Sequence, residues 1–334
     1  MLNIYNNKEK IKNFLQVKGD EQKALFKEAR IIRNRLCKNK VYVRAVLEVS
    51  NYCCCNCKFC GNAVYAKVDK RYRMTYEEIK LQVDMAKKLG LDVIHIASGE
   101  DKGFDFEVLS KSVDYIIKNN MYPELAVGKL DEKQYRELYK IGVRRFILKF
   151  ETSDRKLFSK IKPCNSGLNE LLDLVKELIQ MGMQVGTGNI VGLPGQSLES
   201  IVDDLLLVQK LGVSMASTSV FIPNKESIFK NEKKGDSNIA LNYIALLRCM
   251  NRNTNFSIPA NSTFGQEGKK RALQYVANEL SLNLTPEKYK NIYSIYEGKN
   301  RAKADLDSIK KIIADADCEL ASIEGVIYEK NSNC

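Results

Sequence analysis

A repeating alternation of short apolar runs and amphipathic helices constrains the fold of this chain more than any other feature. Residues 74–90 and 168–182 carry apolar positions three and four apart and end on glycine, as helices that cover a sheet do. Apolar, β-branched runs alternate with such segments. We expect strands at 41–49, 92–98, 124–128, 144–151, 184–192, 214–222, 256–260 and, more weakly, 277–283.

Strands separated by helices form parallel sheets, because each crossover returns the chain to the same edge. This number of units favours an α/β fold of the (β/α)8 TIM-barrel type. An open Rossmann sheet is the alternative, but no GxGxxG motif follows the first strand. We expect an N-terminal helical extension at 1–40, the barrel at 41–300, and a helical tail at 301–334 that could cap one end.

Composition narrows the class of protein. The formal net charge of +12 admits anionic partners, but the lysines are scattered and no basic run is interleaved with aromatic residues, so a nucleic-acid partner is not expected. No apolar stretch is long enough to cross a membrane, and the N-terminus lacks the apolar core of a secretory signal. The sequence predicts a cytoplasmic protein with no membrane partner.

The stretch "SNYCCCNCKFCGN" places five of the ten cysteines in eight positions, directly after the first expected strand. Neighbouring cysteines do not bridge each other easily, so this density indicates metal or redox chemistry. Cys53, Cys57 and Cys60 can bind three irons of a [4Fe–4S] cluster and leave the fourth iron open. A zinc site on Cys54, Cys57 and Cys60 is the alternative, but structural zinc needs four ligands. Cys54 and Cys55 are either spare thiols or transient ligands.

The CxxxCxxC loop after a first barrel strand resembles the radical S-adenosylmethionine (SAM) enzymes. The likeness extends over "RYRMTYEEI", "SGED", "FETSDRKLFSKIKP", "GNIVGLPGQSLESIVDDLLLV", "VFIPN" and "IPANSTFG". It is greatest to the branch that contains the [FeFe]-hydrogenase maturase HydE, biotin synthase and methylornithine synthase. The resemblance implies a [4Fe–4S] cluster and S-adenosyl-L-methionine as cofactors, and reductive cleavage of SAM to a 5′-deoxyadenosyl radical that acts on a small substrate inside the barrel.

The resemblance also assigns residues. It implies that Phe59 lies against the adenine of SAM, that the SGED segment binds the amino group of SAM, and that Glu151 contacts SAM. It places backbone beside the adenine after the fifth strand, and further residues around the floor or entrance of the substrate cavity. The SAM-contacting positions are Phe59, Ser98, Gly99, Glu100, Asp101, Glu151, Gly192, Leu193 and Pro194; the candidate substrate contacts are Arg145, Asn261, Ser262, Thr263, Tyr293 and Tyr296.

Two departures from the maturase pattern bear on specificity. Lys149 and Phe150 stand where the family has Arg-His, which replaces a planar two-pronged donor by a point charge. Glu170 falls near the position of an arginine that binds the SAM carboxylate. We therefore expect a nearby cation to compensate, with Lys149 as the candidate cofactor-binding residue.

The resemblance implies a HydE-like enzyme. Alternatives are an enzyme like methylornithine synthase, or another HydE paralogue, acting on an amino-acid-derived substrate. A non-catalytic Fe–S scaffold is the alternative from another class. The partners implied are a small-molecule substrate and a reductant such as flavodoxin or ferredoxin. The sequence leaves open the substrate, a second cluster on other cysteines, and the oligomeric state.

Overall fold

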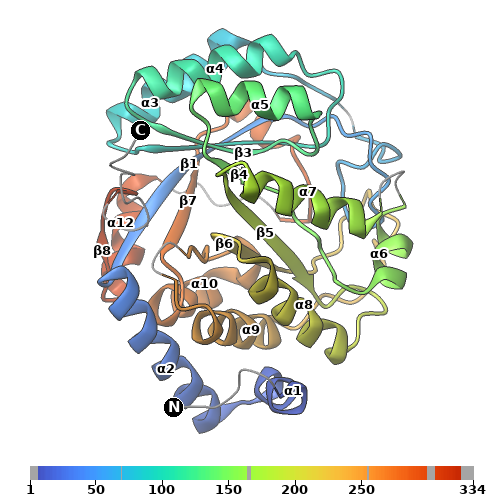
Figure 1. Ribbon diagram of the computed structural model, residues 1–334, viewed down its shortest axis with the longest axis vertical. Helices are drawn as coiled ribbons and strands as arrows, with labels where there is room; N and C mark the ends of the chain where they lie inside the picture. The colour runs from blue at the N-terminus through green and yellow to red at the C-terminus, as the bar shows by residue number, and fades with distance from the viewer. Residues whose placement is uncertain (1–6, 69, 164–166, 254–255, 299–304, 325–334) are drawn as a thin grey trace.

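The computed structural model describes residues 7–68, 70–163, 167–253, 256–298 and 305–324. Figure 1 shows strands at the centre with helices around them. The strands are β1 (Lys40–Ser50), β2 (Val93–Ser98), β3 (Tyr122–Ala126), β4 (Arg145–Ile147), β5 (Gln184–Val191), β6 (Met215–Val220), β7 (Glu279–Asn283) and β8 (Glu319–Leu320). The helices are α1 (Lys8–Gln16), α2 (Gly19–Cys37), α3 (Tyr76–Lys88), α4 (Phe106–Lys118), α5 (Glu132–Ile141), α6 (Arg155–Ile161), α7 (Leu168–Gln180), α8 (Leu198–Leu211), α9 (Ser237–Met250), η1 (Ser262–Phe264, a 3-10 helix), α10 (Gly265–Tyr275), α11 (Glu287–Lys290) and α12 (Leu306–Asp315).

The sheet follows the strand order β6-β5-β4-β3-β2-β1-β7, and its strands pair in parallel. Both faces of such strands are buried, which explains why they read as continuous apolar runs in the sequence. The parallel, helix-covered sheet confirms the predicted α/β fold of the TIM-barrel type. The C-terminal ends of all its strands meet at one end of the barrel, which we call the mouth; the opposite end is the floor.

Residues 256–260 lie between β6 and β7. Ser257 bridges Met215 of β6, and Pro259 bridges Glu279 of β7. The amide of Ala216 donates to the carbonyl of Ser257 (3.0 Å), and the amide of Ala260 donates to that of Glu279 (2.9 Å). The segment is thus in the predicted place but is not a regular strand, because a proline has no N–H for the ladder.

The N-terminal helices pack outside the barrel, as predicted. Helices α1 and α2 lie against α9, at the bottom of Figure 1. The side-chain amide of Gln22 in α2 donates to the side chain of Asn242 in α9 (2.7 Å), and the side chain of Asn242 in turn donates to the carbonyl of Leu15 in α1 (3.0 Å). This cover explains why nearly every residue of α9 is buried.

The C-terminal segment contains a helix, as expected, and also a short strand. Helix α12 packs near β7 and α10, and β8 pairs with the beginning of β1. Residues 301–304 and 325–334 of the expected tail lie outside the described residues, so the domain boundaries stay predictions. No helix in the described part of the chain combines the length and apolarity needed to cross a membrane.

The fourth strand is shorter than the sequence predicts. We expected 144–151, but β4 ends at Ile147. Glu151 still pairs with β5: its amide donates to Gly188 (3.0 Å), and its carbonyl accepts from Ile190 (2.9 Å). Glu151 has φ +62°, a left-handed conformation that a regular strand does not contain, so the predicted strand does not run regularly to residue 151.

Candidate active site

The cysteine stretch lies in the loop between β1 and α3, at the mouth of the barrel. Arg71 holds this loop by donating to the backbone carbonyls of Asn51, Asn62 (2.9 Å), Ala63 (2.8 Å) and Ala66 (3.4 Å). One guanidinium thus ties together carbonyls on both sides of the cysteines. The loop is thereby shaped by a partly buried cation rather than by regular secondary structure.

The SGED segment after β2 lies directly against the cysteine loop. The amide of Cys54 donates to the carbonyl of Glu100 (2.9 Å). A Cβ at Gly99 would lie 2.4 Å from the carbonyl oxygen of Tyr52 and 2.6 Å from the Cβ of Cys53, so only glycine allows this approach. Gly128 gives similar room to Glu100 from the end of β3. Ser98 is half-buried and donates within the segment, to the carbonyl of Gly99 (2.7 Å).

The thiols of the cysteine loop lie close to one another. Cys53 and Cys55 are hydrogen-bonded through their side chains, and Cys55 also contacts Cys57. The hydrogen bond with Cys55 and burial both raise the pKa of Cys53. Burial raises the pKa of Cys60 to about 12. The thiols of Cys53 and Cys60 are therefore neutral near pH 7 without metal, and binding a metal must release their protons.

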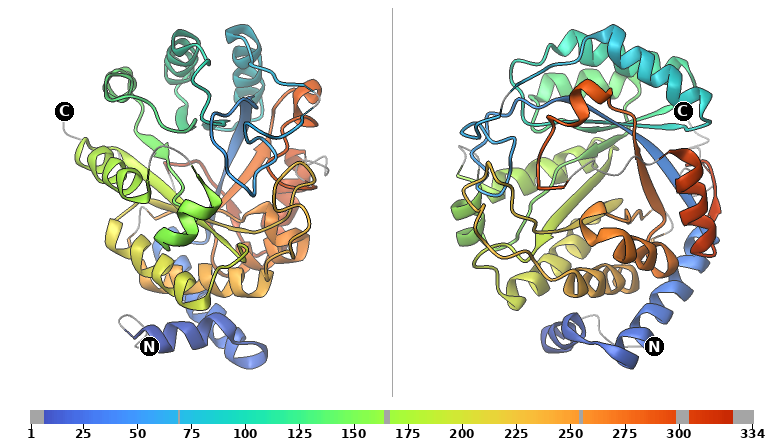
Figure 2. Two further views of the ribbon diagram at one scale, coloured as in Figure 1. Left: turned by 90° about the vertical axis from the view of Figure 1, so that its right-hand side faces the viewer. Right: turned by 180° about the vertical axis from the view of Figure 1, so that it is seen from behind.

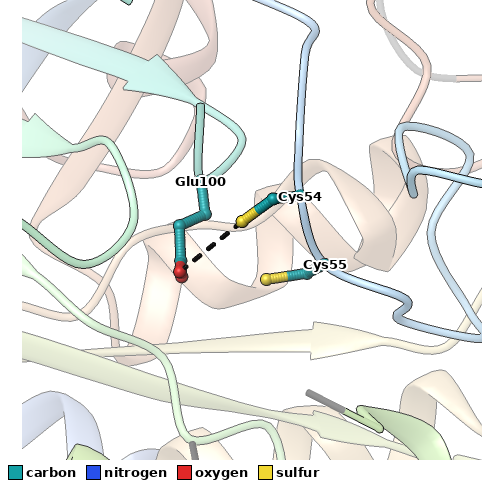
Figure 3. Close-up of side chains that lie close together, drawn as sticks. All are labelled: Cys54, Cys55 and Glu100. Atoms are coloured by element: carbon teal, nitrogen blue, oxygen red, sulfur yellow. Dashed lines mark hydrogen bonds between the residues drawn. The ribbon is translucent and has the colours of Figure 1, made fainter. Parts of the chain in front are cut away.

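Cys54, Cys55 and Glu100 form a compact group at the same place. Their ligand atoms all lie within 4.8 Å of one another, and the Cys54 thiol lies 3.8 Å from a Glu100 carboxylate oxygen. Figure 3 shows both sulfur atoms beside the Glu100 carboxylate. Cys54 is exposed whereas Cys55 is buried. The two cysteines that the sequence left without a role thus differ in environment.

Asp101 does not point a free carboxylate at the loop. It accepts two hydrogen bonds from Arg73 (2.8 and 2.7 Å), one from Ser50 (2.6 Å) and one from the amide of Gly103 (3.0 Å). Burial alone would raise the pKa of Asp101, but these donors hold it below its ordinary value. The carboxylate therefore fixes the SGED segment to β1 and to the loop.

Glu151 and Lys149 form a pair at the mouth. Their charged atoms are 3.2 Å apart, and the lysine ammonium also lies 3.4 Å from the hydroxyl of Ser219. The buried oxygen Oε2 of Glu151 accepts no well-aligned hydrogen bond from the described residues. The backbone of Glu151 is left-handed, which is costly for a residue with a side chain. Backbone strain of this kind is found mainly at functional sites.

The cation beside Glu170 is not Lys149. Glu170 is exposed, and its carboxylate lies 3.8 Å from the ammonium of Lys129, which follows β3. Lys149 is instead occupied with Glu151, on the inner wall of the barrel. The expectation that Lys149 compensates Glu170 is therefore corrected, because the two residues belong to different ion pairs. A role for Lys149 in binding SAM stays a prediction.

Apolar side chains separate the cysteine loop from the end of β5. Phe59 packs against a cluster of buried residues that includes Ile190 and Leu193. The loop from Gly192 to Pro194 is held by Gln196, whose side chain accepts from the amide of Gly192 (2.7 Å) and donates to the carbonyl of Ile190 (2.9 Å). Phe59 and Leu193, predicted from different segments, thus belong to one apolar patch.

The candidate substrate residues do not lie together. Asn261 donates to Ser219 (3.1 Å) on the β6 side of the barrel, and Ser262 pairs with Tyr296 (2.6 Å). Thr263 is buried and accepts from the amide of Val220 (2.8 Å), which is a structural contact. Tyr293 is buried near Tyr72 and the cysteine loop. Arg145 is at the first position of β4, at the other end of the barrel.

The floor of the barrel contains a buried network of charges. Glu124 accepts hydrogen bonds from Arg44 and from His95 (2.7 Å), and its other carboxylate oxygen forms an ion pair with Arg145 (2.9 Å). Arg44 also lies 2.8 Å from Glu279. Burial alone would raise the pKa of Glu124, but Arg44 and Arg145 hold it below its ordinary value. Burial lowers the pKa of His95. Two arginines and two glutamates balance each other here.

Sequence reasoning missed the residues that shape the mouth. Arg71 and Arg73 both belong to the quoted motif "RYRMTYEEI", but nothing in their spacing shows that they bind a loop. Asn224 was also missed. It is buried, donates to Ser294 (3.0 Å), and lies where a Cβ on Gly61 would be 2.5 Å away. These contacts join segments far apart in the sequence, so no local signal predicts them.

Known proteins share both the sequence and the fold. Residues 47–208 match the family described as the Radical SAM superfamily. The chain is 36% identical over 279 residues to the [FeFe] hydrogenase maturase subunit HydE of Thermotoga maritima, which covers 83% of this chain and 79% of the relative. It is 26% identical to 3-methylornithine synthase of Methanosarcina acetivorans, over 69% of this chain and 65% of that one.

Two solved structures have the same architecture. Methylornithine synthase (PylB) superposes with a TM-score of 0.84 at 21% identity, and the match covers 94% of both chains. The maturase HydG from Carboxydothermus hydrogenoformans gives 0.80 at 20% identity, over 94% of this chain and 76% of that one. The chain belongs to the radical SAM family of enzymes. Its relatives include HydE, methylornithine synthase and biotin synthase.

Proposed function

We propose that this enzyme binds a [4Fe–4S] cluster through Cys53, Cys57 and Cys60 and cleaves SAM to start radical chemistry on a small molecule inside the barrel. The observation that carries the proposal is the meeting of three segments at the mouth. The cysteine loop after β1, the SGED segment after β2 and the strained Glu151 after β4 converge there, and Cys60 is close enough to Glu151 for their charges to interact.

The residues present fit such a cluster. The thiol of Cys55 interacts with those of Cys53 and Cys57, and Cys60 is close enough to Cys53 for their charges to interact, so the loop brings the three proposed ligands to one place. Zinc would need a fourth ligand, and the only histidine, His95, is hydrogen-bonded to Glu124 at the floor. When bound, the cluster supplies one electron to SAM and thereby a carbon-centred radical for hydrogen abstraction.

The protein's own residues would bind and orient SAM. The carboxylate of Glu151, which has Lys149 as its ionic partner, can also accept from an ammonium or from ribose hydroxyls, which is a charge-assisted contact. The apolar patch of Phe59 and Leu193 offers a dry surface for the adenine, and Gln196 keeps the neighbouring backbone in place. Ser98, Gly99 and Glu100 would meet the amino group, while Asp101 would act by holding that segment.

For the substrate, we propose a HydE-type reaction, as the relative's name suggests, with the ionic floor closing the barrel below. One observation favours the second candidate, an amino-acid-derived substrate. Lys149 and Glu151 present opposite charges 3.2 Å apart on the inner wall. A zwitterion carries the complementary pair, a carboxylate for Lys149 and an ammonium for Glu151.

Anaerobic reconstitution with iron and sulfide tests the proposal. Reduced with dithionite, the protein should bind SAM and release 5′-deoxyadenosine slowly without any substrate. A protein that carries a cluster but neither binds nor cleaves SAM would be an Fe–S scaffold, and the proposal would fail. Expression in a strain that lacks its own HydE then separates the two substrates, because only a maturase restores hydrogenase activity.

A further inference from the structure

Three segments meet on the outer side of the cysteine loop. The amide of Lys58 donates to Ile161 at the end of α6 (2.8 Å). The carbonyl of Lys58 accepts from Phe229 (3.1 Å), in the segment that follows β6. The right-hand view of Figure 2 shows that segment, in yellow, beside the blue cysteine loop. The backbone next to Cys57 is thus the junction of the three segments.

Two large apolar side chains are exposed beside this junction. Val64 is 54% exposed and Ile228 is 56% exposed. The amide of Ile228 donates to the hydroxyl of Tyr65, which neighbours Val64 (3.4 Å). That hydroxyl donates in turn to the carbonyl of Cys57 (2.9 Å). One tyrosine therefore connects the exposed apolar residues to the cysteine loop.

Basic residues lie in the same three segments as this apolar pair and the junction. Lys67 belongs to the cysteine loop, Lys160 to α6, and Lys225 and Lys230 to the segment after β6; all four are exposed. Within the described part of the chain none of them forms an ion pair. Glu226 and Glu232 lie in the same segment, but two further exposed lysines, at 233 and 234, outweigh them.

An apolar centre with a basic rim is the surface that an acidic protein fits. The proposed reaction consumes one electron for each SAM cleaved, and that electron must enter from outside. We propose that the reductant face, defined as Val64, Ile228, Lys67, Lys160, Lys225 and Lys230, is the docking site of a small acidic flavoprotein that carries one electron. The carrier loses one electron at this face and the cluster gains it, with no further reactant. The inference rests on the proposed function.

Charge removal tests the face against a matched control. The triple variant Lys67→Gln/Lys225→Gln/Lys230→Gln lowers the net charge from +12 to +9. So does Lys88→Gln/Lys140→Gln/Lys210→Gln, whose exposed lysines end α3, α5 and α8 at the floor side. With a flavodoxin as probe, the first triple should raise the Kd about tenfold at low ionic strength, and the second should leave it within twofold. The difference should shrink as salt is added.

The apolar part has its own pair of variants. Ile228→Asp should weaken flavodoxin binding, whereas Leu81→Asp, at a similarly exposed leucine of α3, should not. Flavodoxin-driven formation of 5′-deoxyadenosine should fall with the Kd, while dithionite-driven formation stays at the wild-type rate, because dithionite needs no docking site. Equal flavodoxin affinity in both lysine triples would overturn the inference. Absence of dithionite-driven SAM cleavage in the wild type would refute the proposed function instead, and the flavodoxin Kd would still decide whether the face binds an acidic carrier.

Discussion

The two ends of this barrel treat charged groups in opposite ways. At the floor, Glu124 is fully buried and takes contacts from Arg44, Arg145 and His95. At the mouth, Glu151 has one lysine partner, a partly exposed side chain and a left-handed backbone. Each floor carboxylate therefore contacts several partners in full burial, whereas the mouth carboxylate has a single ionic partner and remains open to a ligand.

This difference separates structural from functional polarity in one fold. A buried charge is costly unless it is paired, so the floor network must be complete for the barrel to be stable. At the mouth a strained, partly exposed carboxylate is tolerated, and a ligand can supply it with a further partner. Arg145, a candidate substrate contact from the sequence, belongs to the buried floor network, which indicates a structural role.

Breaking the floor should give the largest effect on stability. Glu124→Gln leaves two buried arginines with one carboxylate fewer, and we expect a loss of about 3–5 kcal/mol in the free energy of unfolding. Glu170→Gln, at an exposed pair, should change it by less than about 0.5 kcal/mol. Chemical denaturation measures both. Similar losses in the two variants would remove the distinction between floor and mouth.

The buried carboxyl group of Asp204, which contacts the turn after Glu151, should make the free energy of unfolding depend on pH. Asp204 accepts from the amide and hydroxyl of Ser153 (both 2.6 Å) and from Asn189 (2.9 Å), and burial raises its pKa to about 7 from an ordinary 3.8. Between these values the folded protein holds a proton that the unfolded chain releases. The free energy of unfolding should therefore fall as pH rises from about 4 to about 7, by up to about 1.4 kcal/mol per pH unit, and then level off.

The variant Asp204→Asn provides the reference for this effect, since asparagine does not titrate. The difference in unfolding free energy between the wild type and the variant should change with pH in that window and be constant above about pH 8. A difference that is flat from pH 4 to 8 would show that the three hydrogen bonds keep Asp204 ionised.

Glu151 itself should matter for SAM and not for folding. Glu151→Ala removes one charge-assisted contact and should raise the SAM dissociation constant by the equivalent of about 1.5–3 kcal/mol. Glu151→Gly should lose the same affinity without losing stability, because glycine adopts φ +62° without strain. Calorimetry with SAM and thermal unfolding read the two quantities separately. Full SAM affinity in either variant would exclude the assignment.

The approach of two loops at the mouth gives the smallest predicted effect. Gly99→Ala would place a Cβ 2.4 Å from the carbonyl oxygen of Tyr52, and moving the loops apart should cost about 1–3 kcal/mol. Gly167→Ala is the control, since nothing lies within 4 Å of its Cβ. An unchanged melting temperature for Gly99→Ala would mean that the SGED segment is not fixed to the cysteine loop.

The sequence predicted what is periodic or locally dense, and missed what depends on distant contacts. The βα rhythm gave the fold, and the cysteine spacing gave the candidate ligands. β4 ends at Ile147 and Glu151 has a left-handed backbone, and nothing in "KFET" indicates either. The Lys129–Glu170 pair could not be foreseen either, because it joins the loop after β3 to the first turn of α7. Cys164, a candidate for a second cluster, lies outside the described residues.

Iron content and electron paramagnetic resonance of three reconstituted proteins test the central claim most directly. The wild type and Cys54→Ala should each bind about four irons per chain, and Cys53→Ala should lose the cluster. Adding SAM to the reduced wild type should change the resonance spectrum, because SAM binds the iron that no cysteine holds. A cluster that survives Cys53→Ala but not Cys54→Ala, or a spectrum that SAM leaves unchanged, would contradict the account.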